Sequence, residues 1–97
     1  MAARDLVKSI DITAENQWTE EMMIHDVGMI TIENTNLVAT ITLMGRAAGG
    51  SNIIIDTLSI GASDNGKYKF DALGEIFKVG VASGDFTSGA GTIYLKG

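Results

Sequence analysis

The sequence has 97 residues, with 12 acidic and 7 basic side chains, a net charge of −5, no cysteine and no proline. A chain of this length corresponds to one domain, and without cysteine it can form neither a disulfide nor a thiolate metal site. The basic residues are scattered along the sequence, so there is no cluster of cations to bind nucleic acid or an anionic membrane surface.

The sequence also lacks signals for membrane insertion and secretion. No apolar run approaches the length of roughly 20 residues that crosses a bilayer. The first residues, Met1–Asp5, lack the apolar core of a signal peptide. We therefore expect a protein that is made in the cytoplasm without a cleaved secretory signal.

About eight segments have the alternation of apolar and polar residues that is typical of half-buried strands. In chain order, the expected strands are 6–13, 17–24, 27–33, 37–44, 53–60, 67–70, 75–81 and 92–95. β-Branched residues dominate their apolar positions, and the two windows with helical spacing, 13–21 and 71–75, are too short for more than a turn of helix. This pattern predicts an all-β fold, with one antiparallel β-sandwich over residues 1–97 of jelly-roll or immunoglobulin-like type.

Glycine, asparagine and serine mark the expected turns. Asp64-Asn65-Gly66 is a strong hairpin signal, because Asn-Gly readily adopts positive φ. Gly49-Gly50 lies in a wide loop, where we expect glycine to provide flexibility. Gly84 and Gly89 stand where the chain leaves one strand and turns toward the last one. We expect these two to be the least replaceable glycines of the closing segment.

No arrangement of side chains in the sequence favours catalysis. His25 is the single histidine, and its neighbour Asp26 points to the opposite face if the two lie on a strand, so neither can orient the other. Glu20 and Glu21 are adjacent as well and face opposite ways, unlike the paired carboxylates of a glycosidase. We therefore expect no enzymatic activity, no catalytic residue and no cofactor.

Two groups of loop residues carry oxygen ligands of the kind that calcium prefers. They are Asp64, Asn65 and Asp71, and Asp85, Thr87 and Ser88. Their spacing matches no known calcium loop, so we interpret them as turn residues and expect no bound metal. The glycine-rich segment Gly45–Gly50 lacks the helix and the Lys-Ser/Thr ending of a phosphate loop.

The aromatic residues leave a second function open. Trp18 is the single tryptophan, and a lone tryptophan on a strand usually belongs to the core or its edge. A carbohydrate-binding face more often has several aromatics, whereas most of the others here alternate as packing residues do. Carbohydrate or host-surface binding is therefore the alternative function.

Two expected strands break the alternation of apolar and polar residues. Met22-Met23-Ile24 and Ile53-Ile54-Ile55 place apolar side chains on both faces of a strand. Apolar surface beyond the needs of the core marks an interface, so we expect a homo-oligomer or a subunit bound in an assembly. The residues predicted to form this interface are Met22, Ile24, Ile54, Leu58 and Ile60.

Several motifs between about Gln17 and Leu95 resemble a group of small all-β virion proteins of tailed bacteriophages. These motifs are Trp18-Thr19, Thr40-Ile41-Thr42-Leu43, Gly49-Gly50-Ser51, Phe77-Lys78-Val79-Gly80-Val81, Ser83-Gly84-Asp85-Phe86-Thr87-Ser88-Gly89 and Thr92-Ile93-Tyr94-Leu95. The sequence departs from the group at Arg46-Ala47-Ala48, where a polar loop with Asp-Gly is usual. It departs again at Ala90-Gly91, where Gly-Thr follows directly.

The resemblance implies a structural role on a phage particle. Capsid decoration or cement is the role we expect first, and a fibre base is the other. The partners implied are other virion subunits, above all the major capsid protein, and the location implied is the virion. The resemblance carries over no catalytic residue.

Overall fold

The computed structural model describes residues 7–97, which form ten strands and no helix. The strands are β1 (Val7–Ile12), β2 (Gln17–Trp18), β3 (Met22–Ile24), β4 (Val27–Asn34), β5 (Val38–Arg46), β6 (Ile53–Ile60), β7 (Gly66–Asp71), β8 (Glu75–Val81), β9 (Phe86–Ser88) and β10 (Gly91–Lys96). The all-β fold class is confirmed. Two strands more than expected arise because 17–24 is split into β2 and β3, and because β9 has too few residues to show a pattern.

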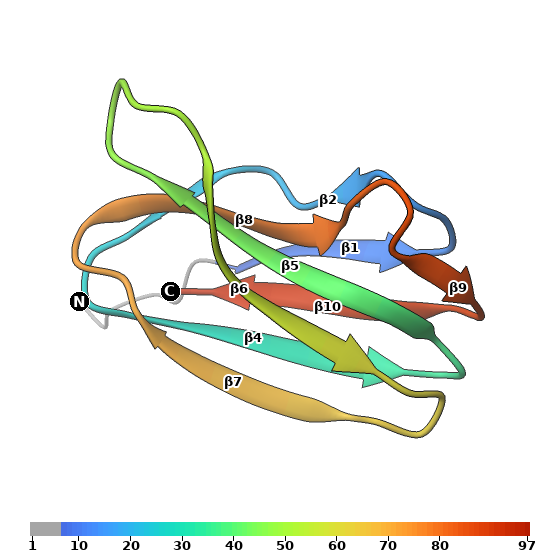
Figure 1. The fold of residues 1–97 in the computed structure, drawn as a ribbon. Coiled ribbons are helices and arrows are strands. Elements are labelled where there is room, and N and C mark those ends of the chain that lie inside the picture. Colours follow the sequence, from blue (N-terminus) through green and yellow to red (C-terminus); the bar gives the residue numbers. More distant parts are fainter. Residues whose placement is uncertain (1–6) are drawn as a thin grey trace.

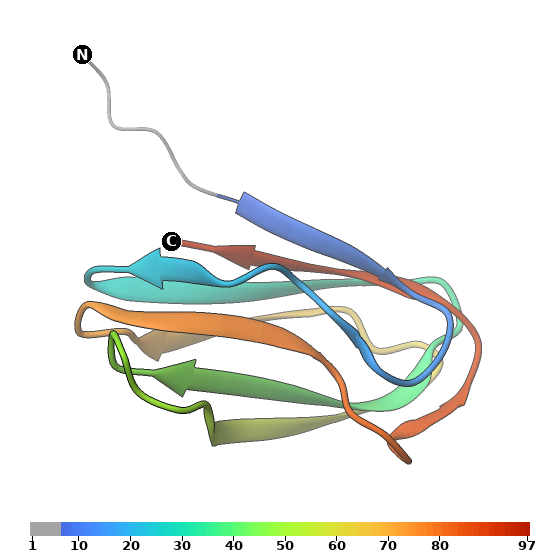
Figure 2. The same cartoon turned by 90° about the horizontal axis from the view of Figure 1, so that it is seen from above.

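The strands form two antiparallel sheets that pack as a sandwich (Figures 1 and 2). Sheet A has the order β1-β10-β4-β7, and sheet B has the order β2-β8-β5-β6, with β3 also paired to β8 and β9 to β5. In both, neighbouring strands run antiparallel.

The strand order identifies the sandwich as a jelly roll. If β2 and β3 count as one interrupted strand, the chain is a long hairpin with the β5–β6 loop at its tip. Its successive strand pairs, β1/β10, β2–β3/β8, β4/β7 and β5/β6, lie alternately in sheets A and B. This is the double-sheet arrangement of a jelly roll. The immunoglobulin-like alternative is wrong, because there the first strand pairs with the second, whereas β1 here pairs with β10.

The core lies between the sheets and is built from alternate residues of each central strand. On β10, Ile93 and Leu95 are fully buried, and on β8 so are Val79 and Val81. The expected faces of the first strand hold for its described part, since Ile12 is buried while Asp11 is exposed. Leu6, the first residue of that expected strand, lies outside the described residues.

Between β2 and β3, the side chain of Thr19 supplies one of the hydrogen bonds that would otherwise join the backbone to β8. Trp18 pairs with Gly80 but Met22 pairs with Phe77, so the segment between them has one residue too many for a regular ladder. Buried Thr19 covers the break. Its N–H donates to the Val79 carbonyl at 2.8 Å, and its hydroxyl accepts the Val79 N–H at 3.1 Å. The backbone N–H and C=O of Val79, which both face this edge, are therefore hydrogen-bonded.

A second irregularity lies in β6. Leu43 pairs with Asp56, but the next residue, Met44, pairs with Ile54, so Ile55 is an extra residue without a partner on β5. Such a bulge interrupts the two-residue period of a strand. It explains why the Ile53-Ile54-Ile55 run does not alternate.

Polar side chains hold together the turns at one end of the sandwich. Asn34 donates to the carbonyls of Leu37 and Gly61 and accepts the Leu37 N–H. Asn36 accepts the Ala90 N–H, and Glu15 accepts the Gly84 N–H. This end carries the turns after β1, β4, β6 and β8 (Figure 1).

Candidate protein-binding surface

Exposed apolar side chains gather toward the opposite end of the sandwich, where the β3–β4, β5–β6 and β7–β8 connections lie (Figure 1). The large apolar residues exposed there are Val7, Met23, Val27, Ile53, Ile54, Ile55 and Leu73. Among the exposed large apolar residues of 7–97, only Tyr68 lies away from this end. The two ends therefore differ in chemistry: one is cross-linked by polar side chains, and the other presents apolar ones.

Four of the apolar side chains on this part of the molecule lie on the outer face of sheet B. Ile76 and Met44 are diagonal neighbours there, because Arg46 lies opposite Ile76 and Lys78 lies opposite Met44. Met23 lies opposite Ile76, and Met44 lies opposite Ile54. Directly opposed residues of an antiparallel pair share a face. The residues beside Met23 and Met44 on their strands are buried, which places these two side chains outside the core. Met23 is 43% exposed and Ile54 is 62% exposed, while Met44 and Ile76 are half-buried. We call Met23, Met44, Ile54 and Ile76 the apolar strip.

The structure corrects most of the interface predicted from the sequence. Met22, Ile24 and Ile60 are 5%, 2% and 4% exposed and belong to the core, so they offer no surface to a partner. Leu58 is half-buried and packs against that core. Ile54 is the one predicted residue that is well exposed.

The physical reason is that a strand with apolar residues on both faces does not reveal which face is inside. In β3 the inward residues are Met22 and Ile24, which leaves Met23 outside. In β6 the bulge at Ile55 shifts the face on which each isoleucine lies. Met23 lies between Met22 and Ile24 and therefore points to the opposite face. The sequence pattern alone does not indicate which of the two faces is exposed.

Two charged side chains clamp the base of the long β5–β6 loop beside the strip. The Arg46 guanidinium donates to both oxygens of Glu21, at 3.1 Å from Nε and 2.9 Å from Nη2. Asn52 also donates to Glu21 at 3.4 Å. The hydrogen bond from Arg46 lowers the pKa of Glu21 from 4.5 to about 2, and the Asn52 bond acts in the same direction. Glu21 in turn raises the pKa of Arg46.

Leu73 is displayed on the turn between β7 and β8. It is 82% exposed, and its φ is 55°, in the left-handed region that a leucine rarely adopts. Hydrogen bonds hold this turn against the β3–β4 turn: the Ala72 N–H donates to the Asp26 carbonyl and the Gly74 N–H to the Ile24 carbonyl. A large apolar side chain is thus fixed in an unfavourable conformation where water surrounds it.

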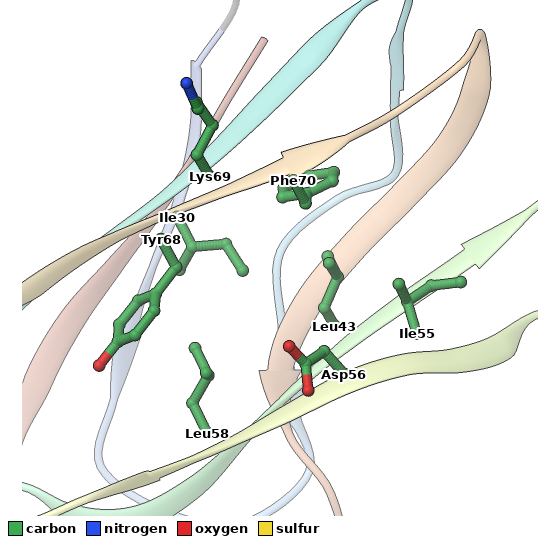
Figure 3. A pocket seen from close by; sticks show the side chains of 8 residues that line it. All are labelled: Ile30, Leu43, Ile55, Asp56, Leu58, Tyr68, Lys69 and Phe70. Carbon is green, nitrogen blue, oxygen red and sulfur yellow. The ribbon is translucent and has the colours of Figure 1, made fainter.

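A small hollow lies at the side of the sandwich, between the edge strands β6 and β7 (Figure 3). Its volume is about 110 Å³. It is lined by Ile30, Leu43, Ile55, Asp56, Leu58, Tyr68, Lys69 and Phe70. Figure 3 shows the Lys69 amine pointing away from the hollow, whereas Asp56 stands beside Leu58 and Leu43.

The residues considered for catalysis or metal binding do not converge. His25 and Asp26 are exposed in the β3–β4 turn. Glu20 pairs with Lys8 at 3.3 Å, while Glu21 pairs with Arg46, so the two carboxylates serve different partners. Among residues 7–97 no three histidine or carboxylate side chains stand close enough together to hold a metal ion.

The oxygen-rich loop residues act within turns. Asp64 accepts the Gly61 N–H and Asn65 accepts the Asn34 N–H, both at 2.8 Å. Asp71 lies at the end of β7, away from that turn. Asp85 forms backbone hydrogen bonds with Ala82 and Thr40 at the start of the β8–β9 connection.

The aromatic side chains outside the core are dispersed. Trp18 lies at the β2 edge of sheet B with the Lys78 amine 4.9 Å from its ring centre. Tyr94, on sheet A, donates to Glu33 at 2.6 Å. Tyr68 borders the hollow. They form no shared platform.

Comparisons with known proteins add little to this description. No family model matches the chain, and no curated protein matches it. A solved structure titled "Bacillus endospore appendages form a novel family of disulfide-linked pili" is 12% identical, with a TM-score of 0.45, over 96% of this chain and 85% of that one. A likeness this weak carries no functional information.

No helix among residues 7–97 is long and apolar enough to cross a membrane.

Proposed function

We propose that this chain is a structural protein of a tailed-phage virion, a capsid decoration or cement protein that acts by binding other protein subunits. The observation that carries the proposal is the apolar strip, together with Leu73 on the same end of the molecule. Water-exposed apolar surface of this kind costs free energy until a partner covers it. The resemblance of the sequence to small virion proteins is the reason for proposing a phage particle as the assembly.

The alternative, a carbohydrate- or host-surface-binding module of a phage fibre, has less support. Stacking on a sugar needs exposed aromatic rings on one face, and Trp18, Tyr68 and Tyr94 lie on three different parts of the surface. The large apolar residues exposed at the end with the β3–β4, β5–β6 and β7–β8 connections are not aromatic. Such residues fit a protein partner better than a polar glycan.

Mass spectrometry of purified virions from the source that encodes this chain tests the proposal, followed by cryo-electron microscopy of the same particles. We expect the chain on the capsid with Met23 and Ile54 against another subunit. Met23→Lys and Ile54→Lys should then abolish binding to particles that lack the chain, whereas Thr57→Lys, farther along the same outer face, should not. Absence of the chain from virions, or a strip that faces solvent in the particle, contradicts the proposal.

A further inference from the structure

The free edge of β6 differs from the edges that soluble proteins usually leave exposed. β6 has eight residues and, within residues 7–97, pairs with β5 alone, so its other side is an open row of backbone groups in that part of the chain. Exposed edges are normally protected by lysine, proline or very short strands. β6 has no lysine or proline, and it begins with three exposed isoleucines. The bulge at Ile55 and the charged side chain of Asp56 are its protective features.

The hollow lies where an added strand would direct its side chains. A strand paired to the free edge of β6 extends sheet B over the open side of the sandwich, facing β7. Its inward side chains share a face with Asp56 and Leu58, which both line the hollow. Main-chain bonds to β6 and side chains in the hollow are the two components of strand addition.

Asp56 defines which side chain fits. Its Oδ1 accepts the N–H of Thr57 at 2.8 Å, and it forms no ion pair within residues 7–97, where the pairs Lys8–Glu20 and Arg46–Glu21 lie elsewhere. The walls around it are mainly apolar and include the Tyr68 ring, while the amine of Lys69 points away from the hollow. A long side chain with an apolar stem and a cationic head matches these walls, the carboxylate and the aromatic ring together.

We propose that β6 binds an extended segment of another protein that carries a lysine or arginine opposite Asp56. The stem of that side chain fills the hollow, and its charged head pairs with the Asp56 carboxylate. A second copy pairing through its own β6 does not meet this requirement, because Asp56 is the one charged residue of that strand. This inference goes beyond the proposed function, since it concerns a different surface and requires no virion.

The test uses the full chain labelled with ¹⁵N and three capped peptides. Each peptide alternates valine and threonine over about nine residues, long enough to pair along the whole of β6, and the central residue is lysine, norleucine or glutamate. We expect the lysine peptide to shift the amide resonances of β6 and β7 and to protect β6 amides from hydrogen exchange. Its Kd should be about fivefold or more below that of the norleucine peptide, with the glutamate peptide weakest.

The variant Asp56→Asn should remove the preference for lysine over norleucine. It keeps the size of the side chain and its acceptor for the Thr57 N–H, so folding is preserved. Asp71→Asn, at the end of β7, is the matched control and should leave the preference intact. Four results overturn the inference: shifts outside β6 and β7, equal affinity for the lysine and glutamate peptides, no shift at about 1 mM peptide, or concentration-dependent β6 resonances without peptide, which indicate that a second copy covers the edge.

Discussion

Arg46 and Glu21 form a two-pronged ion pair that joins β5 to the segment between β2 and β3. Because the guanidinium stabilises the ionised carboxylate, the pKa of Glu21 falls from 4.5 to about 2. The pair therefore stabilises the fold fully above pH 4.5, where Glu21 is ionised in both the folded and the unfolded chain. This contribution is lost as the pH falls toward about 2, because the unfolded chain binds the proton first.

Glu21→Gln should accordingly lower the free energy of unfolding at neutral pH, with a difference from the parent that shrinks between pH 4.5 and about 2. Urea denaturation at a series of pH values measures this difference. Glu20→Gln is the matched control: its carboxylate is 83% exposed and pairs with Lys8 at 3.3 Å, so little change is expected. A Glu21→Gln difference that stays constant over that range shows that the ion pair is not its source.

Thr19→Val should destabilise the protein by about 1–3 kcal/mol, because it leaves the Val79 N–H buried without an acceptor. Valine has nearly the same shape, so the loss reports the hydroxyl and not the packing. Thr19→Ser retains the hydroxyl and should recover most of the stability. Equal losses for valine and serine would mean that the threonine methyl group, and not the hydrogen bond, is what the site requires.

Two glycines with the same backbone conformation allow a test of steric space. Gly84 and Gly89 have φ of 83° and 82°, but a Cβ on Gly84 meets open space, whereas one on Gly89 overlaps the Asn36 carbonyl. Gly84→Ala should cost about 1 kcal/mol from the left-handed conformation alone. Gly89→Ala should cost more. Gly50→Ala should cost least, because its φ is not in that region and a Cβ there meets a single tight contact, the Ala47 carbonyl oxygen at 3.1 Å. Melting temperatures in a different order contradict this account.

The sequence predicted the parts of this fold that depend on a regular period. Strands such as β4 and β10 alternate without interruption, so their extents and inward faces follow from the pattern. The choice of a jelly roll over an immunoglobulin-like sandwich depends on which distant strands pair, as β1 does with β10. The residue pattern within one strand does not indicate which distant strand it pairs with.

The candidate surface was harder to predict because it lies where the two-residue alternation of inward and outward side chains is interrupted. The extra residue before Met22 and the bulge at Ile55 both shift the face of the residues around them. Both bulges depend on the neighbouring strand, so the sequence of the bulged strand does not reveal them. Leu73 was missed for another reason, since an isolated leucine in a turn looks like any other loop residue until its φ is known.

Leu73→Asn should raise stability and lower binding to the partner. Leucine at a φ of 55° is strained, and asparagine tolerates this conformation better, so the variant should gain several tenths of a kcal/mol in the free energy of unfolding. Little packing is lost, because the side chain is 82% exposed. If the leucine is held there as a contact for another subunit, the more stable variant should bind virion particles more weakly.

Asn16 supplies the reverse experiment, because it lies at the polar end with a φ of 58°. Asn16→Leu should lower stability by an amount similar to the gain from Leu73→Asn and should leave binding unchanged. Chemical denaturation measures the first effect, and sedimentation of the chain with particles measures the second. If Leu73→Asn stabilises the fold and binds as well as the parent, the turn is strained for a reason other than display of its leucine, and the binding surface must then be sought on the apolar strip alone.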